Sequence, residues 1–193
     1  MRNTLLILFL VFFAVSCDKD LYLEGGPGNK SEYGRNNAEV GAVQLPFSAT
    51  FTTLPGEYHI QLSEELSISA GGPITGNATH VGLIQEDKSF WTVTGIDFDF
   101  VDIGTEEEPN KVPVSIIESI AGVIHSANGD YYTYEGEAIV SLVGEPVLSG
   151  EMRFTGGTGR FEGVTGAIQL SGSADFEAGS ATFKGNGVII YPR

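Results

Sequence analysis

The chain has 193 residues, 26 of them glycine, with one cysteine and a formal net charge of −15 at pH 7. This length predicts one folded domain, since domains run to about 100 to 200 residues, and the acidic charge excludes nucleic-acid binding because phosphate backbones repel it. The single cysteine excludes a disulfide framework and any metal site built from several thiolates.

The first residues have the order of a secretory signal. Arg2 supplies the positive end, residues 5–15 form an unbroken apolar run, and the small residue Ser16 precedes Cys17. A run of this length does not span a bilayer, which takes about 20 helical residues. We therefore predict a signal peptide over residues 1–16 that is removed and takes no part in the folded domain.

The segment Ala14-Val15-Ser16-Cys17 resembles the lipobox of bacterial lipoproteins, in which the cysteine is acylated and becomes the first mature residue. The resemblance implies lipidation at Cys17, membrane attachment through its acyl chains, and an outer-membrane lipoprotein of the bacterial cell envelope, periplasmic or surface-exposed. The alternative is a free or buried cysteine after an ordinary signal. Residues 17–44, rich in Gly, Asn and charged residues, predict a flexible linker between this anchor and a domain over 45–193.

The body of the chain has the pattern of strands. Short runs of β-branched and aromatic residues are separated by clusters of Gly, Pro, Asn and Asp. Residues 131–142 alternate most clearly, with Tyr132 and Tyr134 on one face and Glu135 on the other. The best helix candidate, 116–124, is β-branched and interrupted by glycine. We predict an all-β domain of eight or nine strands that closes on itself to avoid open edges.

A glycine-rich turn occupies residues 156–166, GGTGRFEGVTG. It lacks the glycine spacing of a dinucleotide-binding loop and the Lys-Ser/Thr pair of a P-loop, and it leads into an expected strand, so phosphate binding is excluded. Instead we expect Gly156, Gly157 and Gly159 to adopt positive φ in a turn, and Gly163 to permit a bend or a close backbone contact in the next strand.

The sequence around this turn resembles the allene oxide cyclase barrel-like family of small bacterial proteins. Plant allene oxide cyclases and dirigent proteins share, more distantly, the glycine turn followed by Phe-x-Gly. Residues 76–82 (GNATHVG) and 126–130 (SANGD) also resemble recurrent stretches of the bacterial family. The resemblance covers residues 45–193 and implies an eight-stranded antiparallel barrel of meandering strands with room for a central cavity. Further residues that carry it are Phe154, Phe183, Gly185, Gly187 and Ile189.

No pattern in the sequence points to a metal or a cofactor. His59, His80 and His125 are far apart and show neither the HExxH spacing nor a close His pair of zinc sites. Asp97 and Asp99 lack the spacing of a calcium loop and are expected on the outer face of a strand. Because no serine lies in a GxSxG elbow and the only cysteine is assigned to the anchor, we assign no catalytic residue.

Four side chains are candidates for lining a cavity, because a barrel of about eight strands can hold one small ligand: His80, Trp91, Tyr132 and Tyr134. Core packing would account for the same residues. Three functions stay open: a non-enzymatic, lipid-anchored envelope protein that is structural or binds a small apolar ligand, an isomerase or cyclase acting on a lipid-derived substrate in the cavity, and a protein-interaction module. An open pocket with a buried charge would favour binding or an enzyme, and a filled interior would favour the other roles.

Overall fold

The structure is a computed structural model and describes residues 41–62, 67–105 and 108–193. All of these residues belong to one compact unit, Asn37–Arg193. The predicted signal peptide, Cys17 and most of the predicted linker lie outside the described residues. In the described part of the chain, no helix has the length and hydropathy needed to cross a membrane.

The described residues form an all-β fold, as predicted, and one short 3-10 helix, η1 (Gly159–Phe161). The strands of the main sheet are β1 (Val43–Thr53), β4 (Gly71–Ala78), β5 (Gly82–Leu83), β6 (Phe90–Asp102), β7 (Lys111–His125), β8 (Tyr131–Ser141), β9 (Val147–Gly157), β10 (Thr165–Asp175) and β11 (Ser180–Tyr191). A separate hairpin is made of β2 (His59–Gln61) and β3 (Ser67–Ser69).

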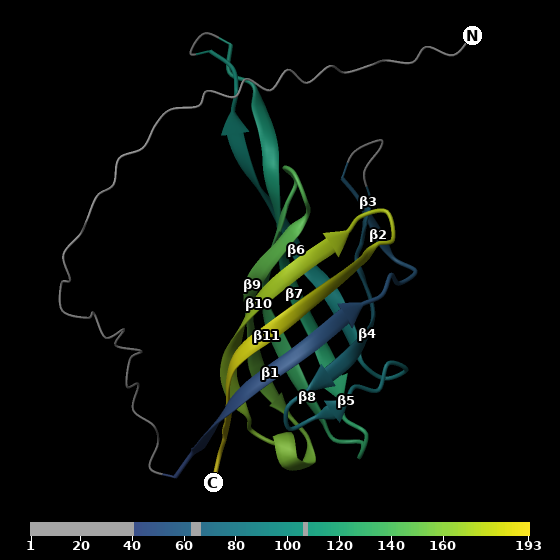
Figure 1. Cartoon of the computed structure of the whole chain (residues 1–193), viewed down its shortest axis with the longest axis vertical. Coiled ribbons are helices and arrows are strands. Elements are labelled where there is room, and N and C mark those ends of the chain that lie inside the picture. Colours follow the sequence, from purple (N-terminus) through teal and green to yellow (C-terminus); the bar gives the residue numbers. More distant parts are fainter. Residues whose placement is uncertain (1–40, 63–66, 106–107) are drawn as a thin grey trace, which may run out of the picture. The chain divides into compact units, whose positions relative to one another are not determined.

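The main sheet has the order β1-β11-β10-β9-β8-β7-β6-β4-β5, and β1 also pairs with β4. This additional pairing closes eight of the nine strands into an antiparallel ring, and the two-residue strand β5 adds to the edge of β4. The arrangement confirms the predicted eight-stranded barrel, and Figure 1 shows its strands wrapping around a common interior.

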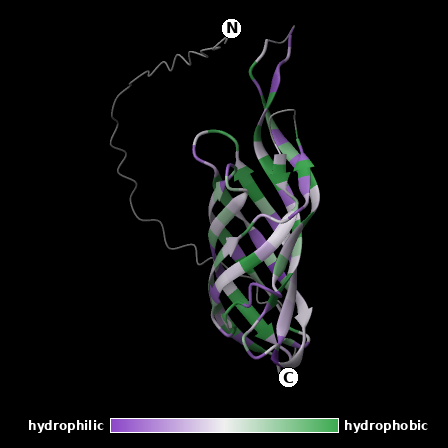
Figure 2. Cartoon of the chain, turned by 90° about the vertical axis from the view of Figure 1, so that its right-hand side faces the viewer, coloured by the Kyte–Doolittle hydropathy of each residue, from purple (hydrophilic) through white to green (hydrophobic). Residues whose placement is uncertain are grey.

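Side chains alternate between the interior and the outside along the strands. In β8, Tyr132, Tyr134, Ala138 and Val140 are buried, whereas Glu135 is exposed, which confirms the predicted alternation. Figure 2 shows apolar and polar bands following one another along the strands. Burying the inward-facing apolar side chains stabilises the fold by roughly 25 cal/mol per Å² of apolar surface. A shift of one residue in the pairing of a strand would turn all of these side chains to the outside.

The ring has its shortest pairings at β4. Whereas β1 and β11 share eleven residue pairs, β1 meets β4 through five and β4 meets β6 through three. Two backbone hydrogen bonds outside these ladders support the join: the Val93 N–H donates to the Ala70 carbonyl, and the Leu54 N–H donates to the Pro73 carbonyl, both at 2.9 Å. This seam encloses the interior of the barrel.

A β-bulge in β6, between residues 93 and 95, changes which side chains of that strand point inward. Before the bulge, Trp91 lies opposite Gly122 of β7, and after it Ile96 lies opposite Glu118. Partner residues in an antiparallel pair share a face of the sheet. Strict alternation would place Trp91 and Ile96 on opposite faces, so the bulge allows both to face the interior.

The glycine-rich turn joins β9 to β10 and contains η1. Gly156 and Gly159 have positive φ angles of 129° and 55°. Gly157 does not have a positive φ, contrary to the prediction. A Cβ at this position would lie 2.2 Å from the Tyr131 carbonyl oxygen, so the close approach of the two backbones is what requires glycine. Gly163 lies in the turn before β10 rather than within the strand, and its φ is 67°.

The hairpin of β6 and β7 extends past the rest of the sheet (Figure 1). Residues 100–102 of β6 pair with residues 111–113 of β7, beyond the last pairs that either strand makes with β4 or β8. The large apolar side chains of Phe100, Val101 and Ile103 are exposed on this extension.

The β1–β4 seam can be tested at Gly76, which lies opposite Phe51 of β1. Gly76 has a φ of 138°, and a Cβ there would lie 2.0 Å from the Thr50 carbonyl oxygen. We predict that Gly76→Ala lowers the free energy of unfolding by about 3 kcal/mol, because it strains the backbone and forces the two strands apart. Urea denaturation measures the loss.

The matched control for this variant is Gly129→Ala. Gly129 also has a positive φ, 92°, but no atom lies within 4 Å of its built Cβ. The control is expected to lose only about 1 kcal/mol, the cost of the backbone conformation alone. Equal losses in the two variants would contradict tight closure at this seam.

Candidate binding cavity

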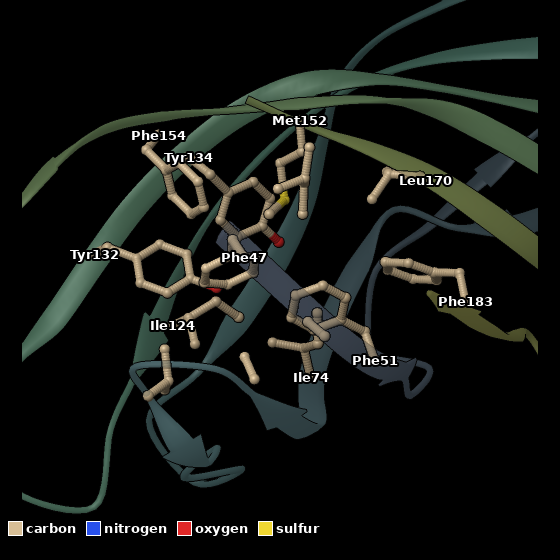
Figure 3. Close-up of a cluster of buried hydrophobic side chains, with 14 of the residues drawn as sticks. Phe47, Phe51, Ile74, Ile124, Tyr132, Tyr134, Met152, Phe154, Leu170 and Phe183 are labelled. Carbon is tan, nitrogen blue, oxygen red and sulfur yellow. The ribbon is translucent and has the colours of Figure 1, made fainter. Parts of the chain in front are cut away.

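One half of the barrel interior is filled by an aromatic cluster, Phe47, Tyr132, Phe154 and Phe161, each at most 4% exposed. Ring centroids in three of its pairs lie 5.0, 5.1 and 5.6 Å apart in edge-on contact, a geometry that stabilises beyond the area it buries. Figure 3 shows Phe47, Tyr132 and Phe154 packed together inside the sheet. The cluster closes the interior at the end that carries η1.

A cavity of about 70 Å³ lies in the other half of the interior. Ala138, Ala174 and Ala181 contribute small side chains to its wall, so this level of the barrel is less filled than the aromatic cluster. The volume has room for about five water-sized groups at about 10 to 15 Å³ each. The wall is mostly apolar and includes Ile120, Val140, Leu148, Met152, Leu170 and Phe183.

The lining also includes β3 and the turn between β10 and β11, so the cavity reaches the end of the barrel opposite η1. Polar side chains gather at this end. The Ser69 hydroxyl donates to the Gly71 carbonyl at 2.8 Å, and the Asp175 carboxylate accepts a hydrogen bond from the Ala178 N–H at 2.9 Å. These bonds hold the local turns and leave the cavity wall itself largely apolar.

Glu118 brings a carboxyl group into this apolar wall. It lies on β7 on the same face as the buried Ile116 and Ile120, and its cross-strand neighbours are Ile96 of β6 and Ala138 of β8. Burial raises the pKa of the Glu118 carboxyl from 4.5 to about 7, because apolar surroundings disfavour the charged form. Among the described residues, no hydrogen bond or ion pair to this carboxyl offsets the effect.

Two aromatic side chains with polar groups flank Gly122 of β7. Trp91 is its partner on β6 and Tyr134 its partner on β8. A Cβ at Gly122 would lie 2.5 Å from the Tyr134 hydroxyl, so the glycine makes room for the tyrosine ring. Burial raises the pKa of Tyr134 above its ordinary value, which keeps the hydroxyl neutral. The Trp91 indole N–H donates to the Leu54 carbonyl at 3.4 Å.

The four candidate lining residues from the sequence have three different positions. Trp91 and Tyr134 line the cavity. Tyr132 belongs to the aromatic cluster, where its buried hydroxyl has no hydrogen-bond partner in the described part of the chain. His80 is exposed in the turn after β4, with a positive φ of 66°, and its Nε2 lies 3.0 Å from the Pro46 carbonyl oxygen. His80 therefore lies outside the cavity rather than inside it.

No grouping of at least three His, Cys, Asp or Glu side chains suited to a metal ion occurs within 41–62, 67–105 and 108–193. His59 lies in β2, and His125 ends β7 with its ring 4.9 Å from that of Tyr131.

Sequence reasoning missed Glu118. The signal that could have found it is its position in the strand: Ile116, Glu118, Ile120, Gly122 and Ile124 share one face, and Glu118 is the polar exception among them. A lone carboxyl on an inward face indicates either an unusual core or a site.

No protein-family model matches the sequence, and no curated protein matches it. Two solved structures to which the chain is similar are pterocarpan synthase dirigent proteins. The first is 16% identical with a TM-score of 0.41, and the comparison covers 79% of this chain and 87% of that one. The second is 18% identical with a TM-score of 0.38, covering 79% of this chain and 96% of that one.

The raised pKa of Glu118 predicts a pH dependence of stability. The folded protein holds this proton up to about pH 7 and the unfolded chain only to about pH 4.5, so the carboxyl's contribution to stability is lost as pH rises through that window. Glu118→Gln removes the titration. We predict that its free energy of unfolding, relative to wild type, increases by about 3 kcal/mol between pH 4 and pH 8.

Denaturant unfolding across this pH range measures the difference. Glu137→Gln on β8 is the matched control, because Glu137 is exposed on the outer face, and its difference from wild type is expected to stay constant. A constant difference for Glu118→Gln as well would show that the Glu118 carboxyl is not desolvated in the folded protein.

Proposed function

We propose that this protein is a non-enzymatic binding protein that takes a small, mostly apolar molecule into the cavity of its barrel. The observation that carries the proposal is the cavity of about 70 Å³ between apolar walls. Protein interiors are close-packed, and an empty space of this kind costs stability. The volume suits a molecule of about five non-hydrogen atoms, or one end of a longer molecule.

One observation favours an isomerase or cyclase as a second candidate. Glu118 is a carboxyl with a pKa of about 7 in an apolar cavity, and a carboxyl in that range can give and take protons near neutral pH. Its action would be proton transfer to a lipid-derived molecule held against the same walls. Turnover of a co-purified molecule by the wild type, lost in Glu118→Gln, would support this candidate over simple binding.

The sequence supports a place for this binding protein at the bacterial outer membrane. The lipobox-like segment ending at Cys17 and the linker that follows would attach the barrel through acyl chains, and more than one chain is needed for stable attachment. A tethered barrel would meet small apolar molecules at the membrane surface, on its periplasmic or its outer side.

Filling the cavity should abolish binding. Ala138 lies on β8 with 4% exposure and lines the cavity beside Glu118. We predict that Ala138→Leu weakens the binding of n-butanol, which has five non-hydrogen atoms, at least tenfold, because the longer side chain occupies the space that the ligand needs. Changes in protein NMR signals on titration with n-butanol measure the affinity, and mass spectrometry of the extracted wild type identifies molecules that co-purify.

Ala121→Leu on β7 is the matched control. Ala121 lies opposite Glu135, which is exposed on the outer face, so the same added carbons do not enter the cavity. This variant is expected to bind n-butanol as the wild type does. The proposal fails if the wild type binds no n-butanol and no n-butylamine and releases no small molecule, or if Ala138→Leu binds n-butanol as well as Ala121→Leu.

The proposed anchor is tested at Cys17. We predict that Cys17→Ser removes radiolabelled palmitate from the protein and moves it from the membrane fraction to the soluble fraction after expression in a bacterium, since the serine carries no lipid. Ser16→Ala, which keeps a small residue at the neighbouring position, is expected to keep the label. Membrane association that persists in the unlabelled Cys17→Ser protein would overturn the anchor.

A further inference from the structure

The charges around the cavity all have one sign. Two carboxyl groups, Glu118 in the wall and Asp175 at the β10–β11 end, belong to the lining, and no Lys, Arg or His belongs to it in the described part of the chain. In the described part of the chain, the ion pairs join Arg153 with Glu151 and Arg160 with Asp130. None of these four residues lines the cavity. No basic side chain of the lining can therefore neutralise Glu118.

The other strands packed around the cavity offer Glu118 no positive partner. β8 contributes Tyr134, whose hydroxyl is neutral, and β10 contributes its last residue, Asp175, which carries a second carboxyl group. β1, β3, β6, β9 and β11 contribute uncharged lining side chains, as Trp91, Met152 and Phe183 illustrate. An isolated buried carboxylate is costly and becomes favourable when an opposite charge reaches it. The missing positive charge can come from a ligand.

We propose that the cavity is selective for small alkylamines, whose protonated nitrogen pairs with the Glu118 carboxylate while the alkyl chain contacts the apolar wall. This inference rests on the proposed binding function and names the class of its ligand. The net charge of −15 favours the approach of a cation over that of an anion. A primary amine of four carbons has five non-hydrogen atoms, which matches the space available.

The pairing predicts how affinity depends on pH. An alkylammonium ion keeps its proton well above pH 8, as lysine side chains do, so Glu118 is the group whose titration governs binding. With a pKa of about 7, the carboxylate is the major form at pH 8 and a minor one at pH 5.5. Amine affinity should therefore fall about 30-fold between these two pH values, and the affinity of a neutral alcohol of the same length should not.

The experiment compares n-butylamine with n-butanol, titrated into the full chain and followed by NMR. At pH 8 we expect the amine to bind at least tenfold more tightly than the alcohol, the gain of a charge-assisted hydrogen bond. Glu118→Gln is expected to remove this preference and to keep the affinity for the alcohol, which shows that the variant is folded. Asp175→Asn, at the end of the cavity, is expected to keep the preference.

The possible failures can be told apart. If the alcohol binds and the amine binds no more tightly, or if the preference survives in Glu118→Gln, the inference is overturned and the proposed binding function stands. If neither compound binds the wild type at pH 8 and no small molecule co-purifies with it, the binding function fails and the inference fails with it. If the preference is lost in Asp175→Asn but kept in Glu118→Gln, then Asp175 recognises the amine instead of Glu118, and this also overturns the inference.

Discussion

Closure of the sheet through β4 is the constraint on which the other features of this protein depend. The eight strands of the ring have an inside only because β4 joins β1 on one side and β6 on the other, and it does so through five and three residue pairs. Gly76 allows the backbone of β4 to approach that of β1. Without this join, the inward faces of β6, β7 and β8 would form an open surface, and Glu118 would be solvated like any exposed glutamate.

The enclosed space is used differently at its two ends. At the η1 end, the rings of Phe47, Tyr132, Phe154 and Phe161 fill the interior. At the other end, alanines on β8, β10 and β11 leave a cavity, and a carboxyl is held against its apolar wall. The same strands therefore supply a packed half that stabilises the barrel and an open half suited to a ligand. The raised pKa of Glu118 follows from this division, because desolvation alone accounts for it.

The sequence predicted the features that depend on local pattern. Alternation in 131–142 correctly placed Tyr134 inward and Glu135 outward. The bulge in β6 and the short seam at β4 depend on pairing between distant strands, which alternation within one strand does not encode. His80 was expected on the inward face of a strand, but the strand ends before it and the residue lies in a turn. The inward position of Glu118 is not evident from residues 116–124 alone, because β-branched residues occupy both faces of this stretch and the pairing with β6 and β8 decides which face is inward.

The central claim is that the Glu118 carboxyl lies in an apolar cavity without a charged partner. Carbon-13 NMR titration of the glutamate side-chain carboxyls, with the Glu118 signal assigned from its absence in Glu118→Gln, measures this most directly. Our account predicts a titration midpoint for Glu118 at about pH 7 in the ligand-free protein. A midpoint near 4.5, the ordinary value for glutamate, would mean that the carboxyl is solvated, and it would contradict both the apolar surroundings of Glu118 in the cavity and the ligand chemistry inferred from them.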